Sequence, residues 1–100
     1  MTQTEPRIPE RLRREIVLFA RKRAVHKIIL FGSRATGKAG ARSDVDLAVC
    51  GGDFDGFYLD LTEHAHTLLS FDLIDYDNAA GEELKKEIVR DGIVLYEKAG

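Results

Sequence analysis

The chain has 100 residues, which is enough for one domain with one hydrophobic core, and we treat residues 1–100 as a single domain. Apolar residues make up 44% of the sequence and charged residues 32%, so the composition excludes intrinsic disorder. The 15 basic and 17 acidic residues give a net charge of −2, which argues against nucleic acid or an anionic membrane as the main partner.

The sequence also limits where the protein works. The single Cys50 cannot build a disulfide framework, and the N-terminal residues lack the apolar segment of a secretory signal. No apolar run is long enough to cross a hydrocarbon layer of about 30 Å. We therefore expect a reduced, cytoplasmic protein without a membrane span, in which the polar residues 1–7 are frayed.

The first half of the chain contains one predicted helix and two predicted strands. Pro9 suits the first turn of a helix, and Leu12, Ile16 and Phe19 then fall on one stripe. The β-branched run His26–Phe31 predicts a buried strand that ends at a glycine. A turn region, Gly32–Ser43, leads to a second strand, Asp44–Cys50, which is followed by two more glycines.

The second half adds two helices and two strands. Apolar residues recur at helical spacing over residues 54–69, and Phe71–Tyr76 predicts a third strand. Asn78 can cap a helix that carries Leu84, Ile88 and Val89, Gly92 suits a left-handed position after it, and Ile93–Tyr96 predicts a last strand. The order α-β-β-α-β-α-β indicates an α/β fold with one small mixed sheet.

The loop after the first predicted strand has two interpretations. In the first, residues 32–38 match the G-x-x-x-x-G-K part of a P-loop, which makes Lys38 a phosphate ligand. Ala39 stands where that motif needs a hydroxyl group to bind Mg²⁺, and no helical apolar pattern follows. We therefore disfavour a P-loop ATPase.

In the second interpretation, Gly32 and Ser33 act with Asp44 and Asp46. Side chains alternate along a strand, so these two carboxylates point the same way, about 6–7 Å apart at the backbone. Mg²⁺ prefers oxygen ligands and is usually held by one or two carboxylates and the phosphates of a substrate. Gly32 lets the backbone approach a phosphate, and the Ser33 hydroxyl can hydrogen-bond to it. Arg34 either clamps the triphosphate by its charge or is solvated.

A third carboxylate is expected from the third strand, where Asp72 and Asp75 lie on opposite faces. We choose Asp72, because an acid flanked by Phe71 and Leu73 is costly to bury unless a cation holds it, whereas Asp75 lies near the strand end. Asp72 is expected to bind the metal, and it is also a candidate base for an acceptor hydroxyl.

The pattern of Gly32-Ser33, ten further residues and Asp44-Val45-Asp46 resembles the signature of the polymerase-β-like nucleotidyltransferases, and more narrowly their minimal nucleotidyltransferase (MNT) domains. The resemblance extends from Ile28 to Tyr96. It implies the polymerase-β-like fold and transfer of a nucleoside monophosphate, commonly AMP from ATP, to a hydroxyl group with Mg²⁺, in a site for two ions. Asp44, Asp46 and Asp72 are then the catalytic metal ligands, and Gly32, Ser33 and Arg34 bind the nucleotide.

The same resemblance implies a partner. Short MNT domains resemble the catalytic half of pairs in which a helical HEPN-type protein, in many cases a toxin, is neutralised by adenylylation. We therefore expect a hetero-oligomer in which this chain is an enzyme and an antitoxin. The alternative is an antitoxin that masks its HEPN-type partner without catalysis.

Overall fold

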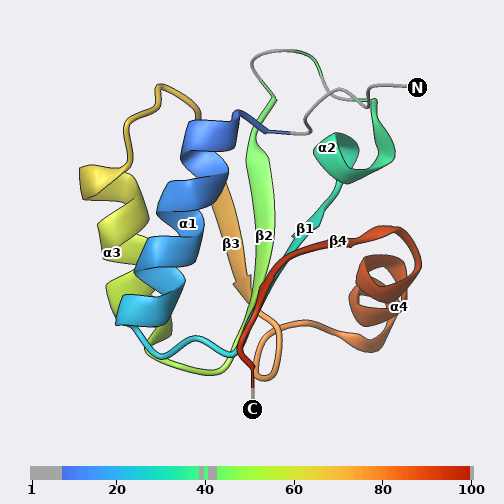
Figure 1. Ribbon diagram of the computed structural model, residues 1–100. Coiled ribbons are helices and arrows are strands. Elements are labelled where there is room, and N and C mark those ends of the chain that lie inside the picture. The colour runs from blue at the N-terminus through green and yellow to red at the C-terminus, as the bar shows by residue number, and fades with distance from the viewer. Residues whose placement is uncertain (1–7, 39, 41–42, 100) are drawn as a thin grey trace.

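The computed structural model describes residues 8–38, 40 and 43–99, so the expectation for residues 1–7 lies outside it. The helices are α1 (Glu10–Lys22), α2 (Ser33–Thr36), α3 (Phe54–His64) and α4 (Glu82–Asp91). The strands are β1 (Lys27–Phe31), β2 (Val45–Cys50), β3 (Phe71–Asp75) and β4 (Ile93–Glu97). The predicted α/β class is confirmed (Figure 1), and the predicted order lacked only α2. No helix in the described ranges is long and apolar enough to cross a membrane.

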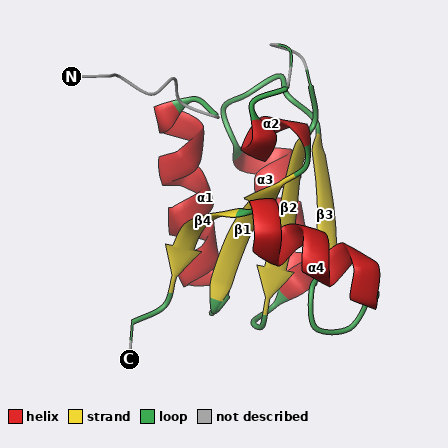
Figure 2. Cartoon of the chain, turned by 90° about the vertical axis from the view of Figure 1, so that its right-hand side faces the viewer, coloured by secondary structure: helices red, strands yellow, loops and turns green. Residues whose placement is uncertain are grey.

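The four strands form one mixed sheet in the order β3-β2-β1-β4. Strand β1 pairs antiparallel with both β2 and β4, whereas β2 and β3 are parallel. Helices α1 and α3 cover one face and α4 lies on the other, as Figures 1 and 2 show from two directions. Because β1 runs opposite to β2 and β3, its last residue and their first residues meet at one end of the sheet, next to α2.

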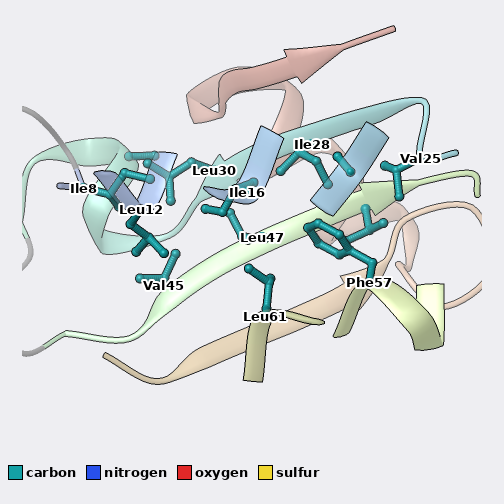
Figure 3. Packing of buried hydrophobic residues seen from close by; sticks show 13 residues of the cluster. Ile8, Leu12, Ile16, Val25, Ile28, Leu30, Val45, Leu47, Phe57 and Leu61 are labelled. Carbon is teal, nitrogen blue, oxygen red and sulfur yellow. The ribbon is translucent and has the colours of Figure 1, made fainter. Parts of the chain in front are cut away.

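The alternation of side chains along β2 separates the core from the candidate site. Val45, Leu47 and Val49 are buried under α1 and α3, where they pack against Leu12, Ile16, Phe57 and Leu61 (Figure 3). Ala48 faces the other way and packs with Ile29 and Ile88 under α4. Asp46 shares the parity of Ala48, so its carboxylate lies on the α4 face and outside the main core.

The helix predicted over residues 54–69 is shorter in the structure and ends at His64. Ala65 adopts an extended conformation, and the amide and ring of His66 both bond to the carboxylate of Glu15 in α1. This contact draws the chain away from the helix axis. Leu68, which the periodicity placed on the helix, is consequently fully exposed.

The last predicted helix also begins later than expected. Its N-cap is Gly81 rather than Asn78, whose side chain instead donates a hydrogen bond to the Asp75 carboxylate in the turn after β3. The expectation for Gly92 was wrong as well, because its φ of −72° and ψ of 153° are extended. A Cβ atom there would lie 2.5 Å from the Ile29 side chain, so glycine is needed for close packing.

A partly buried ion pair joins the two helices that cover the core. Arg23, at the end of α1, donates hydrogen bonds from Nε and Nη2 to the two carboxylate oxygens of Asp60 in α3, at 2.9 and 3.2 Å. Asp60 is only 3% exposed. These hydrogen bonds lower the pKa of Asp60, so its carboxylate stays charged although it is buried.

We expect Asp60→Asn to lower the free energy of unfolding by about 2–3 kcal/mol at pH 7, somewhat less than for a fully buried pair, because Arg23 keeps some solvent contact. A group with a lowered folded-state pKa stabilises above its unfolded pKa, and this contribution is lost as the pH falls through the folded pKa. The difference between parent and variant should therefore shrink below about pH 4. Urea titrations at several pH values measure it.

The matched control is Glu63→Gln, which makes the same kind of change at an exposed position on α3. Its effect should stay within about 0.5 kcal/mol. Equal losses in the two variants would contradict the role assigned to the Arg23–Asp60 pair.

Candidate active site

Gly32 and Asp46 are in direct contact at the end of the sheet where β1 finishes. Gly32 has a φ of 74° and a ψ of −153°, a backbone conformation that essentially only glycine adopts. A Cβ atom on Gly32 would lie 2.2 Å from Oδ2 of Asp46. The bend after β1 is therefore shaped so that its backbone lies directly against the Asp46 carboxylate.

The predicted third carboxylate lies on the same face as Asp46. In the parallel register between β2 and β3, Asp46 is aligned with Asp72, and aligned residues of neighbouring strands point to the same side. Asp44 directly precedes β2 and shares the parity of Asp46. Asp75 is aligned with Val49, which faces the main core side. The choice of Asp72 over Asp75 thus agrees with the register.

The reason given for choosing Asp72 was nevertheless wrong. The expectation was a carboxylate buried in the middle of a strand, whereas Asp72 is exposed. Its strand lies at the edge of the sheet, so its first residues have a neighbour on only one side. Asp46, on an inner strand, is the half-buried member of the group.

Asp46 is the acidic residue of the site whose pKa is raised by its surroundings. Burial raises the pKa of its carboxyl group, and the negative charges of Asp72, Asp44 and Glu87 raise it further. Glu87 belongs to α4, which covers this face of the sheet, and nothing in the sequence pattern singled it out. The face therefore has a surplus of negative charge that a bound cation would offset.

The donor atoms suit a hard divalent cation. Carboxylate oxygens are the ligands that Mg²⁺ prefers, and the charged neighbours that raise the pKa of Asp46 are all carboxylates. In the described part of the chain, no three His, Cys, Asp or Glu side chains already form a metal-binding group. The three carboxylates share a face and a sheet end without being gathered around one point.

Part of the turn region predicted after Gly32 is helical in the structure. Residues 33–36 form the one-turn helix α2 within the predicted turn, and Ser33 is its first residue. Arg34 is only 7% exposed, so the solvated alternative is excluded. Its Nε and Nη2 atoms donate hydrogen bonds to the backbone carbonyl of Ser43, at 3.0 and 2.9 Å. No side-chain pattern could have predicted this contact, because the acceptor is a main-chain carbonyl.

Lys38 does not have the setting of a P-loop lysine. Helix α2 ends at Thr36, and Gly37 follows it in a left-handed conformation. Lys38 is exposed and lies outside any helix, whereas a P-loop lysine lies where a long helix begins. The structure therefore supports the preference for the second interpretation of the loop.

We expect Asp46→Asn to raise the thermal stability of the protein in a buffer that contains a chelator. A carboxyl group with a raised folded-state pKa destabilises the fold at neutral pH, and this penalty disappears as the pH falls through that pKa. The melting temperature of the variant should exceed that of the parent at pH 7, and the two should converge in acid. Asp75→Asn, on the opposite face of β3, is the control and should show no such gain.

We expect Gly32→Ala to lower the free energy of unfolding by about 1–3 kcal/mol, because alanine is strained in this backbone conformation. Part of the loss comes from the clash with the Asp46 carboxylate. The same change in an Asp46→Ala background should therefore cost less, which denaturant titration of the four chains measures. Equal costs in both backgrounds would show that the two residues are not in contact.

Comparison with known proteins identifies a matching family and solved structures with a similar fold. The family described as polymerase beta, nucleotidyltransferase matches residues 14–99, whereas a search of curated proteins gives no match. A toxin-antitoxin complex crystallised with AMP-PNP has 24% identity and a TM-score of 0.66 over 86% of this chain and 73% of that one. A mutant of the toxin-antitoxin complex MntA-HpeT has 22% identity and a TM-score of 0.65 over the same shares.

Identities this low show a shared fold, and the family match gives the assignment. It covers the chain from within α1 to beyond the end of β4, so it includes the whole sheet and every candidate site residue. The expected polymerase-β-like fold is thereby confirmed. The chain belongs to the polymerase beta nucleotidyltransferase family.

Proposed function

We propose that this chain is a Mg²⁺-dependent MNT enzyme of the cytoplasm that transfers AMP from ATP to a hydroxyl group on a helical HEPN-type partner, and that it acts as an antitoxin. One observation carries the proposal. In a member of a nucleotidyltransferase family, the β2–β3 register aligns Asp46 with Asp72 on one face, and the Asp46 carboxylate lies against the backbone of Gly32. Acidic side chains and a close-approach glycine are what a metal-bound triphosphate needs.

Asp44, Asp46 and Asp72 would hold the metal, in a site for two ions. The surplus of negative charge around Asp46 supports this role, because binding a cation offsets repulsion that is already present in the fold. When bound, Mg²⁺ neutralises the triphosphate and the charge that develops on the leaving group.

Gly32 and Ser33 would bind the β- and γ-phosphates. The bend at Gly32 has no side chain to obstruct a phosphate oxygen, and the Ser33 hydroxyl stands directly beside it in the chain. The resemblance also implies that Arg34 binds the nucleotide. Its hydrogen bonds to the Ser43 carbonyl favour a different role, the positioning of a neighbouring peptide group.

The reaction forms a bond between the acceptor oxygen and the α-phosphorus of ATP. The bond from that phosphorus to the oxygen bridging to the β-phosphorus breaks, and pyrophosphate leaves with the electron pair. The hydroxyl proton passes to a base, for which exposed Asp72 is the candidate because it is accessible to an incoming acceptor. No covalent intermediate on the protein is required.

Similarity to solved structures supports a protein partner. Two structures with similar folds are described as toxin-antitoxin structures, and one of them was crystallised with the ATP analogue AMP-PNP. We therefore place the acceptor hydroxyl on a partner protein.

We expect Asp46→Asn to reduce AMP transfer by at least about 100-fold, because a neutral amide binds Mg²⁺ poorly and the positioning of the triphosphate is lost. Circular dichroism should show an intact fold. Asp75→Asn makes the same substitution on the other face of β3 and should retain parental activity. Transfer by Asp46→Asn at the parental rate would refute the site assignment.

The activity is best tested with the chain expressed together with the proteins encoded in the neighbouring genes. After incubation with Mg-ATP, intact-mass spectrometry should show a partner heavier by one AMP. Label from ATP should be transferred from the α-phosphate and never from the γ-phosphate. Tight association without an adduct would refute the enzymatic proposal in favour of masking, and γ-phosphate release that depends on Lys38 would favour an ATPase.

A further inference from the structure

The loop between α2 and β2 ends in a backbone group that a buried arginine holds. The Ser43 carbonyl accepts hydrogen bonds from both Nε and Nη2 of Arg34, at 3.0 and 2.9 Å. Charge-assisted hydrogen bonds are stronger than neutral ones, and two on one oxygen restrict its position. Arg34 also projects from α2, whose N-cap is Gly32, so one end of the brace is fixed beside the bend at the candidate site.

The braced group is the peptide that carries Asp44. The carbonyl of Ser43 and the amide nitrogen of Asp44 belong to one planar peptide unit, so fixing the oxygen fixes the plane from which Asp44 begins. On the other side of Asp44, the amide of Val45 donates to the carbonyl of Ser70, at 2.9 Å. Asp44 therefore lies between two anchored peptide groups, one tied to α2 and the other to the residue before β3.

Asp44 is exposed and precedes the first residue of β2, so the sheet itself fixes it less firmly than Asp46. A carboxylate at the end of a strand depends on its flanking peptides for its direction. The two anchors join Asp44 to the bend at residue 32 through Arg34 and to the strand of Asp72 through Ser70. The three acidic residues and the bend are thereby connected through the Arg34 side chain, backbone hydrogen bonds and the β2–β3 pairing.

We propose that Arg34 is a positioning residue, which sets the place of the Asp44 carboxylate by holding the carbonyl of Ser43. This inference rests on the function proposed above, because it gives Asp44 a role in metal binding. This role and a direct contact between Arg34 and a phosphate predict different results. If Arg34 binds a phosphate, its removal weakens nucleotide binding. If Arg34 positions Asp44, its removal weakens metal binding and lowers the turnover rate.

The test compares Arg34→Met and Arg34→Lys with the control Lys38→Met. The control removes an exposed cation just after α2. Arg34→Met should lower kcat by about 10- to 100-fold while KM for ATP changes by less than about twofold. Arg34→Lys can still donate to the Ser43 carbonyl and should recover part of the loss. Lys38→Met should behave like the parent.

Two measurements separate a brace from general destabilisation. Amide hydrogen exchange at Ser43 and Val45 should accelerate about tenfold or more in Arg34→Met, while amides of β1 remain protected. Mn²⁺ binding, followed by electron paramagnetic resonance, should weaken in Arg34→Met but show no further loss when Asp44→Asn is already present. This non-additivity is the signature of action through Asp44.

Three results would overturn the inference: unchanged exchange at Ser43 and Val45, a loss of ATP affinity with kcat retained, or a full additional loss of Mn²⁺ binding in the Asp44→Asn background. Failure of the proposed function appears differently, as an absence of AMP transfer by the parent chain. In that case the exchange and Mn²⁺ measurements still decide whether Arg34 fixes Asp44.

Discussion

The parallel pairing of β2 with β3 is the constraint on which the candidate site depends. It aligns Asp46 with Asp72, and a shift of one residue would turn Asp72 toward the opposite face. The pairing is fixed by the apolar residues that alternate with these acids, since Val45, Leu47, Phe71 and Leu73 pack in the main core. The packing under α1 and α3 thus sets the geometry of charges on the far face. The same strand register therefore determines both the core on one face and the candidate site on the other.

The same arrangement makes the site costly to form. Asp46 is half-buried among like charges, a situation that lowers stability and is characteristic of functional sites. The fold offsets this cost elsewhere, in the closely packed core and in the pair between Arg23 and the buried Asp60. The net stability of the fold is thus the difference between the repulsion at the site and the stabilisation from the core and the Arg23–Asp60 pair.

Much of the fold could be predicted from the sequence, because it depends on periodicity. Each predicted strand appears within a residue or two of its expected bounds. The first two are apolar, β-branched runs that end at glycine, which is a strong local signal. Spacing along the strands predicted that Asp44 and Asp46 share a face and that only one of Asp72 and Asp75 can join them. The choice of Asp72 rested on a burial argument that the structure contradicts, because this residue is exposed. One error arises from a tertiary contact, because Glu15 in α1 binds His66 beyond the end of α3. The other arises from a local turn, because Asn78 donates to Asp75 instead of capping a helix. Glu87 and the contact of Arg34 with the Ser43 carbonyl were not predicted, because both depend on how separate segments pack.

The position of β3 at the edge of the sheet affects how molecules of this protein can associate with one another. Among the described strands it pairs on one side only, which leaves a row of backbone donors and acceptors able to recruit a strand from another molecule. Its sequence, Phe-Asp-Leu-Ile-Asp, is apolar apart from its two acids. Charged residues on a marginal strand discourage such self-association. The like charges of Asp72 and Asp75 therefore oppose pairing of β3 with the same strand of a second copy.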